Sequence, residues 1–175
     1  MKKKIVITGG LGYIGTELCK LYSGVSWHHK IIVIDNRFIS ERVSQIRNWN
    51  IEFIQGDILD KNLIKGYCED ADVIHHLAGI TDVPRIKTET SKDKDNRIKE
   101  VAEKGTQNIL EVISNKCKII FPSTHVVFEG INEVKKDISE NESTNPVLSY
   151  SSSKAVNEDQ IKRSGKNYVI LRLGS

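Results

Sequence analysis

The stretch Thr8-Gly9-Gly10-Leu11-Gly12-Tyr13-Ile14-Gly15 stands between two segments of different character. Lys4–Thr8 is a short run of β-branched residues and predicts a strand, whereas Tyr13–Tyr22 has its apolar residues at helical spacing. Glycine at this density weakens helices and strands, so the backbone must need it. Between a strand and a helix, such glycines permit a tight turn, close approach of a pyrophosphate, and packing of the helix on the strand. The stretch alone is also compatible with a purely structural turn.

Further Val- and Ile-rich runs predict strands at Lys30–Asp35, Ile51–Gln55, Asp72–Leu77, Lys118–Phe121 and Tyr168–Leu173. Helical patterns fall at Phe38–Arg47, Lys94–Ser114 and Leu148–Arg163. Continuous apolar runs, rather than alternating ones, are typical of parallel strands buried on both faces. The alternation of strands and helices therefore predicts an α/β fold with a doubly wound parallel sheet. Two polar segments interrupt it, Thr81–Arg97 and Glu129–Pro146, and the second is predicted to be a long loop.

Composition limits the classes of function. The 175 residues suit one domain, and a net charge of +3 with interspersed signs gives no basis for nucleic-acid binding. The three cysteines are odd in number and lack a CxxC spacing, which indicates free thiols and a reducing compartment. The apolar run after the N-terminal lysines is too short for a signal peptide or a membrane span. We therefore expect a cytoplasmic protein without a membrane partner.

The second predicted strand ends in Asp35-Asn36. An acid at this place hydrogen-bonds the adenosine ribose of a dinucleotide and repels a 2′-phosphate, which favours NAD over NADP. Arg37 is a weak signal in the other direction, because a nearby arginine can hold that phosphate.

Tyr150 and Lys154 form a YxxxK motif in a predicted helix, where residues four apart share a face. An ammonium beside a phenol favours the phenolate, so we expect a lowered pKa for Tyr150 and a role as proton acceptor for a substrate alcohol. By itself the motif is more often that of two solvated side chains. Thr124 follows the fifth strand, where a hydroxyl points into the ligand crevice of a parallel sheet, although threonine is also common at strand ends.

These pieces occur in one order, together with Gly56-Asp57, the HLAG sequence at His76–Gly79, and Ser123-Thr124. In this combination the sequence, from Lys4 to Leu173, resembles the extended short-chain dehydrogenases/reductases, and among them the NAD-dependent nucleotide-sugar epimerases and dehydratases. The resemblance implies a Rossmann-like fold, NAD as cofactor and a nucleotide-sugar substrate. It also implies a homodimer formed through the helices at Lys94–Ser114 and Leu148–Arg163.

The resemblance assigns roles to the matching positions. The pyrophosphate would lie against Gly9, Gly12, Tyr13, Ile14 and Gly15. The adenosine ribose would contact Asp35 and Asn36, the adenine Asp57 and Ile58, and the cleft wall would be Leu77, Ala78 and Gly79. Tyr150 would be the acid/base. Lys154 would bind the nicotinamide ribose and tune the pKa of Tyr150, and Thr124 would be the third catalytic residue. No metal site is implied, and His75 and His76 are expected to pack at a strand end.

The sequence departs from the family pattern at three places. Ala102 stands where many members carry an asparagine ahead of the GTxN sequence, here Gly105–Asn108. His125 follows Thr124 where dehydratases have an Asp-Glu pair, so an epimerase or a simple oxidoreductase is favoured over a 4,6-dehydratase, and His125 is expected to be a loop residue. The last residues lie where members continue into a substrate-binding lobe. We therefore expect residues 1–175 to be a NAD-binding domain that is incomplete at its C-terminus and lacks that lobe.

Two other classes of function remain open from the sequence. One is a non-catalytic dinucleotide-binding module, and the other is an atypical NAD(P)-dependent reductase of a small carbonyl compound. The non-catalytic module would bind NAD, and Tyr150→Phe would change none of its activities. The reductase would consume NADH stoichiometrically, unlike an epimerase.

Overall fold

The computed structural model describes residues 2–81, 92–131 and 137–174. The strands are β1 (Lys4–Thr8), β2 (Lys30–Asp35), β3 (Glu52–Gln55), β4 (Val73–His76), β5 (Lys118–Thr124) and β6 (Asn167–Leu173). The helices are α1 (Tyr13–Ser23), α2 (Ser40–Asn48), α3 (Lys61–Cys68), α4 (Lys92–Val112), the short 3₁₀ helix η2 (His125–Phe128) and α5 (Ser149–Arg163). Strands and helices alternate along most of the chain, as the sequence predicts.

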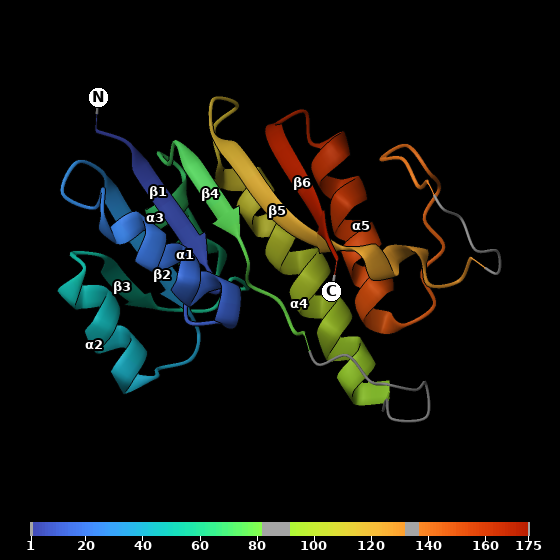
Figure 1. The fold of residues 1–175 in the computed structure, drawn as a ribbon, viewed down its shortest axis with the longest axis horizontal. Coiled ribbons are helices and arrows are strands. Elements are labelled where there is room, and N and C mark those ends of the chain that lie inside the picture. The colour runs from blue at the N-terminus through green and yellow to red at the C-terminus, as the bar shows by residue number, and fades with distance from the viewer. Residues whose placement is uncertain (1, 82–91, 132–136, 175) are drawn as a thin grey trace.

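The six strands form one parallel sheet in the order β3-β2-β1-β4-β5-β6 (Figure 1). The sheet grows outward from β1 on one side through β2 and β3, and on the other side through β4, β5 and β6. The strand order therefore reverses between β1 and β4, where Thr8 is paired with His76. Ligands of open α/β sheets bind in the crevice at the carboxyl ends of the strands beside such a reversal.

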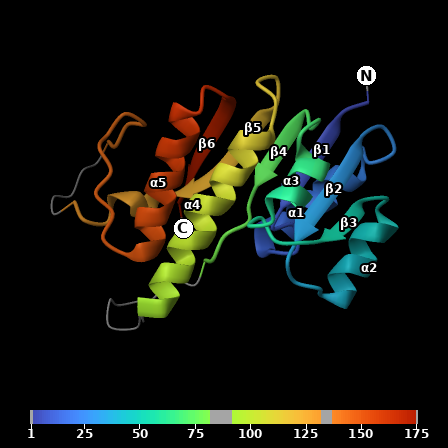
Figure 2. The same cartoon turned by 180° about the vertical axis from the view of Figure 1, so that it is seen from behind.

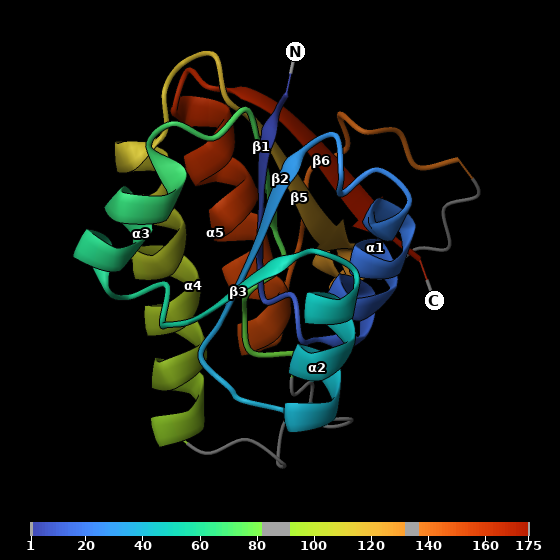
Figure 3. The ribbon, with the colours of Figure 1, turned by 90° about the vertical axis from the view of Figure 1, so that its left-hand side faces the viewer.

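Helices cover both faces of the sheet. The edge-on view in Figure 3 places α1 and α2 on one side and α3, α4 and α5 on the other, and Figure 2 shows the latter three from the front. Each face encloses its own buried apolar cluster. The cluster under α1 and α2 includes Ile7, Leu11 and Ile46, and the cluster under α3, α4 and α5 includes Ile74 and Phe121. This two-sided burial confirms the predicted doubly wound α/β fold.

Some predicted boundaries were wrong, for local reasons. β5 does not stop at Phe121 but continues through Pro122 to Thr124, paired with β6 throughout. α4 begins at Lys92, within a segment expected to be an irregular polar stretch, and Asp93 and Asp95 in its first turn suit the positive end of a helix dipole. Neither α3 nor η2 was predicted. The described residues of the predicted loop at 129–146 contain no helix or strand, while 132–136, like 82–91, lie outside the described residues.

The three cysteines are buried and unpaired. Burial raises the pKa of Cys19 and of Cys68 to about 12, and that of Cys117 to about 11. These thiols therefore pack as small apolar side chains. Among the described helices, none is both long enough and apolar enough to cross a membrane.

Candidate functional site

A cleft of about 870 Å³ opens at the carboxyl ends of the strands. It brings together all fifteen side chains and glycines singled out in the sequence: Gly9, Gly12, Tyr13, Ile14, Gly15, Asp35, Asn36, Asp57, Ile58, Leu77, Ala78, Gly79, Thr124, Tyr150 and Lys154. They come from six different loops, strand ends and helices along the chain. Their individual roles stay predictions, but they face one continuous space.

The glycine-rich turn is closely packed. Gly9 has a positive φ of 71°, and a Cβ built on it would lie 2.7 Å from the Cα of Ala78. A Cβ on Gly15 would lie 2.6 Å from the Cα of Gly10, so side chains there would push the turn and α1 apart. Gly12 precedes α1, which has no side-chain cap and no acidic residue in its first turn. The positive end of α1 is therefore available to an anion in the cleft.

The acidic end of the cleft lies at the ends of β2 and β3. The buried Asp35 accepts hydrogen bonds from the amide of Leu11 at 3.0 Å and from the amide and Nε of Arg37 at 3.0 and 3.2 Å. Asn36 donates to Asp57 at 3.2 Å. Arg37 thus partly neutralises Asp35, and it leaves that carboxylate with fewer free lone pairs for a ribose than the sequence suggests.

The other end of the cleft holds the hydroxyl and ammonium groups. Lys154 Nζ donates to the carbonyl of Pro122 at 2.9 Å and lies 4.4 Å from the centre of the Phe121 ring and 6.0 Å from that of Tyr150. Thr124 ends β5, and its Oγ1 accepts the amide of Val126 at 3.3 Å. The three side chains therefore meet where β5, η2 and α5 converge.

The expected lowering of the Tyr150 pKa is wrong for this structure. Burial raises the pKa of Tyr150 above that of a free phenol. Burial also lowers the pKa of Lys154 to about 8. Both shifts have one cause, because a poorly hydrated cleft disfavours an isolated charge of either sign.

A carboxylate from outside α5 holds the start of that helix. Leu148 precedes α5 and has no side chain that can cap it, but Glu129 accepts the amides of Val147 at 2.8 Å and Leu148 at 2.7 Å, together with the hydroxyl of Ser151. Burial opposes ionisation of Glu129, but these hydrogen bonds outweigh it and keep its pKa below the usual range. Glu129 thereby fixes the turn that carries Tyr150.

Sequence reasoning missed several residues of the cleft. His125, expected to be an ordinary loop residue, lines it beside Thr124, and its Nδ1 lies 3.1 Å from the carbonyl of Leu173. Arg42 and Arg97 also line the cleft, and Arg42 donates to the carbonyl of Leu11. Arg42 belongs to α2 and Arg97 to α4, and neither is part of a sequence motif. Their positions on the cleft are therefore apparent only in the folded chain.

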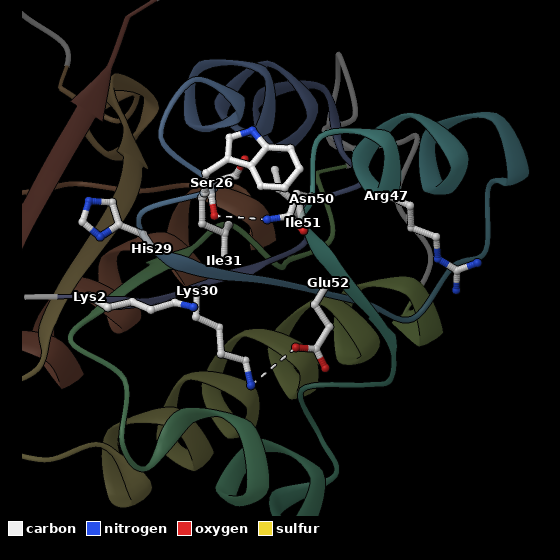
Figure 4. Close-up of a pocket in the computed structure, with 10 residues that line it drawn as sticks. Lys2, Ser26, His29, Lys30, Ile31, Arg47, Asn50, Ile51 and Glu52 are labelled. Carbon is white, nitrogen blue, oxygen red and sulfur yellow. Dashed lines mark hydrogen bonds and ion pairs between the residues drawn. The ribbon is translucent and has the colours of Figure 1, made fainter.

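A second cavity, of about 360 Å³, lies at the other end of the sheet (Figure 4). Several of its polar groups already have partners. Asn50 donates to the carbonyl of Ser26 at 3.3 Å, Lys30 pairs with Glu52 at 3.5 Å, and His29 accepts the amide of Lys3 at 3.2 Å. These polar groups are already satisfied, so the larger cleft is the candidate site.

Comparison with known proteins identifies the family. Residues 6–171 match the 3-beta hydroxysteroid dehydrogenase/isomerase family. The chain belongs to that family. The match extends from β1 to β6 and confirms the resemblance to extended short-chain dehydrogenases/reductases.

Several other proteins are similar to this chain over most of its length. UDP-N-acetyl-alpha-D-glucosaminuronate decarboxylase of Bacillus cytotoxicus is 35% identical over 73% of this chain and 38% of its own length. dTDP-D-glucose 4,6-dehydratase of Dictyostelium discoideum is 29% identical over 96% and 42%. The crystal structure of UDP-glucuronic acid 4-epimerase from Bacillus cereus, in complex with UDP-glucuronic acid and NAD, is 28% identical, with a TM-score of 0.77 over 97% of this chain and 55% of that chain. The chain thus spans about half the length of these relatives or less.

Proposed function

We propose that this chain is the dinucleotide-binding part of a NAD-dependent nucleotide-sugar epimerase. The observation that carries the proposal is the single cleft in which the glycine-rich turn, the two acidic strand ends and the Thr124, Tyr150 and Lys154 side chains meet. The relative solved with NAD and a nucleotide sugar supports it, because it shares the fold over nearly the whole of this chain.

The residues present fit NAD. The uncapped N-terminus of α1 beside Gly12 suits a pyrophosphate, and Asp35 and Asn36 suit the hydroxyls of the adenosine ribose. Leu77–Gly79 would line the path toward the nicotinamide, and Lys154 would hold its ribose. Bound in this cleft, NAD would supply the hydride acceptor for the oxidation of the sugar carbon and the hydride donor for its reduction.

The side chains of the chain would handle the proton. Tyr150 takes the proton of a sugar hydroxyl as the carbon is oxidised and gives it back on reduction. Thr124 would orient the same oxygen. Since burial disfavours both an isolated phenolate at Tyr150 and an isolated ammonium at Lys154, the two charges stabilise one another best when they form together.

Epimerisation is favoured over dehydration by the positions of the acids. Among the described residues that line the cleft, the carboxylates are Asp35 and Asp57, both at the adenosine end. Next to Thr124 stands His125 instead of the carboxylate pair that dehydratases use for water elimination.

The dimer is part of the same proposal. α4 and α5 lie side by side on one face of the sheet (Figure 2), and we propose this face as the contact between two copies of the chain.

Calorimetric titration with NAD and NADP, after removal of any bound nucleotide, tests the cofactor half. We expect NAD to bind, Gly12→Val to abolish binding because Gly12 lines the cleft and a side chain there would occupy the space of the pyrophosphate, and Asp35→Ala to weaken it. Gly66→Val is the matched control, since Gly66 has open space around it. A folded chain that binds no NAD would contradict the proposal.

Because the chain is expected to lack the substrate-binding lobe, the reaction is tested by incubating it with NAD, UDP-glucuronic acid or UDP-glucose, and a substrate-binding lobe supplied in trans. An epimerase forms the 4-epimer without net accumulation of NADH, and Tyr150→Phe abolishes the conversion. Steady formation of NADH would instead indicate a simple oxidoreductase. NAD binding without any conversion would indicate a non-catalytic module.

A further inference from the structure

His76 is a fully buried imidazole that the proposed reaction does not use. It ends β4, directly before the loop Leu77–Gly79 that lines the cleft. Burial, reinforced by the nearby charge of Lys154, lowers the pKa of His76 to about 3. The ring is therefore neutral at physiological pH, with one nitrogen that donates and one that accepts.

Both ring nitrogens have hydroxyl partners. Nδ1 lies 2.9 Å from Oγ1 of Thr8, and Nε2 lies 3.0 Å from Oγ1 of Thr106. Thr8 ends β1 directly before Gly9, whereas Thr106 lies in the middle of α4. One imidazole thus joins the two strands at the reversal of strand order to the helix that covers them.

The Thr8 hydroxyl also contacts the cleft. Its oxygen accepts the amide hydrogen of Ala78 at 3.3 Å. At the same point Gly9 and Ala78 are so close that a Cβ on Gly9 would lie 2.7 Å from the nitrogen of Ala78. The amide of Leu77 also donates to the carbonyl of Thr8 at 3.0 Å. The Thr8 hydroxyl is therefore a second bond, one residue further along, that holds the Leu77–Gly79 loop against the glycine-rich turn.

We propose that His76 is a positioning residue, which acts through its Nδ1 and the Thr8 hydroxyl to hold the Leu77–Gly79 loop against Gly9 in the geometry that binds the dinucleotide. The proposal rests on the proposed function of the cleft. The two ring nitrogens then have different roles. Nδ1 positions the cleft loop through Thr8, and Nε2 holds α4 against the sheet through Thr106.

Two amide variants of His76 test this separation. An asparagine places a polar atom near the position of Nδ1, and a glutamine reaches the position of Nε2. We expect His76→Asn and His76→Gln to lower the melting temperature to a similar extent. His76→Asn should keep NAD affinity within about threefold of the unmodified chain, and His76→Gln should lose about tenfold or more. Equal losses of affinity in the two variants would overturn the proposal.

Isosteric changes of the two threonines provide a second test that perturbs folding less. Thr8→Val should weaken NAD binding about tenfold, whereas Thr106→Val should leave it within about threefold although it also removes a buried hydroxyl. The double variant with Thr8→Val and His76→Gln should bind NAD about as well as either single variant, because both break one connection. A Thr106→Val variant as impaired as Thr8→Val would contradict the proposal.

Hydrogen exchange separates this proposal from the proposed function. The amide of Ala78 should exchange faster in Thr8→Val and His76→Gln, and at the unmodified rate in His76→Asn and Thr106→Val, with no nucleotide present. If the unmodified chain binds no NAD, the function fails while this readout still tests His76. If NAD binds but Ala78 exchanges alike in all four variants, the positioning role fails alone.

Discussion

Lys154 is a charged group in a place that does not favour charge. Its ammonium donates a hydrogen bond to the carbonyl of Pro122 and lies over the aromatic ring of Phe121. A side chain kept in such a place at the expense of stability is typical of a functional site. Lys154, which the sequence assigns to the catalytic site, is therefore also a residue whose charge lowers the stability of the fold.

We predict that Lys154→Met stabilises the chain at neutral pH. Burial lowers the pKa of Lys154 from 10.5 to about 8. An unfolded chain thus binds more protons than the folded one between these values, so stability rises with pH across that window and the full cost is present below it. The cost is about 3 kcal/mol, and the lost contacts offset about 1–2 kcal/mol of it.

Urea unfolding near neutral pH and near pH 10 measures this effect. The gain from Lys154→Met should shrink as the pH rises, because the lysine of the unmodified chain loses its charge. Lys104→Met, at an exposed position of α4, is the control and should change little. A Lys154→Met variant less stable than the unmodified chain at neutral pH would contradict the prediction.

The residues of the site differ in how far sequence reasoning could find them. Gly9, Asp35 and Tyr150 were found because each belongs to a short local pattern. The pairing of His76 with Thr8 and Thr106 was not, because its partners lie 68 and 30 residues away along the chain. The Tyr150 pKa was predicted in the wrong direction, since burial is a property of the folded molecule and not of the YxxxK spacing.

At the scale of elements, the sequence contains indications of α3, which was not predicted, and β5 was predicted too short. Asp60 caps α3 by accepting the amides of Asn62 and Leu63, and an N-cap aspartate before Leu63, Ile64 and Tyr67 is a helix signal. β5 was cut short because Pro122 lacks an amide hydrogen. The strand tolerates this proline because β4 pairs with β5 only as far as Ile120, so at Pro122 no second strand of the described sheet needs an amide hydrogen.

The link between α5 and β6 is a second prediction. Glu158 on α5 is buried and accepts from Arg172 on β6 at 2.9 and 2.7 Å and from Lys162 at 3.1 Å. Burial opposes its ionisation, but the bonds from Arg172 and Lys162 outweigh it and hold the pKa of Glu158 at about 2. Glu158→Gln should therefore destabilise the chain by roughly 3 kcal/mol at neutral pH.

The pH dependence of this pair has a definite sign. A depressed carboxyl pKa contributes stability that is complete above the unfolded value of 4.5 and is lost as the pH falls toward 2. The difference between Glu158→Gln and the unmodified chain should thus close on acidification. Asp159→Asn, which breaks the neighbouring but exposed pair with Arg163, should cost less than about 0.5 kcal/mol. Equal effects of the two variants in urea unfolding would show that the buried pair contributes no more than the exposed one.

At the scale of the whole molecule, the two halves of the sheet are covered unequally. α1 and α2 lie over β1, β2 and β3, while on that same face β6 has no helix over it among the described elements (Figures 1 and 3). Ile170 and Arg172 of β6 point to the α5 side, where one joins the apolar cluster and the other bonds Glu158. Val169 and Leu171 alternate with them and are 36% and 45% exposed.

This exposed strip of β6, Val169 and Leu171, should make the isolated chain associate. β6 is also an edge strand, and apolar side chains beside unpaired backbone groups promote contacts between molecules. We expect the sedimentation coefficient to rise with protein concentration, and the rise to diminish in the variant Leu171→Lys. Leu21→Lys introduces the same charge at a leucine that is 78% exposed on α1 and should leave the association unchanged. If Leu21→Lys suppressed association as strongly as the β6 variant, net charge rather than the β6 strip would control it. If instead all three proteins associated alike, the contact would lie elsewhere, and the face of α4 and α5 would be the surface to change next.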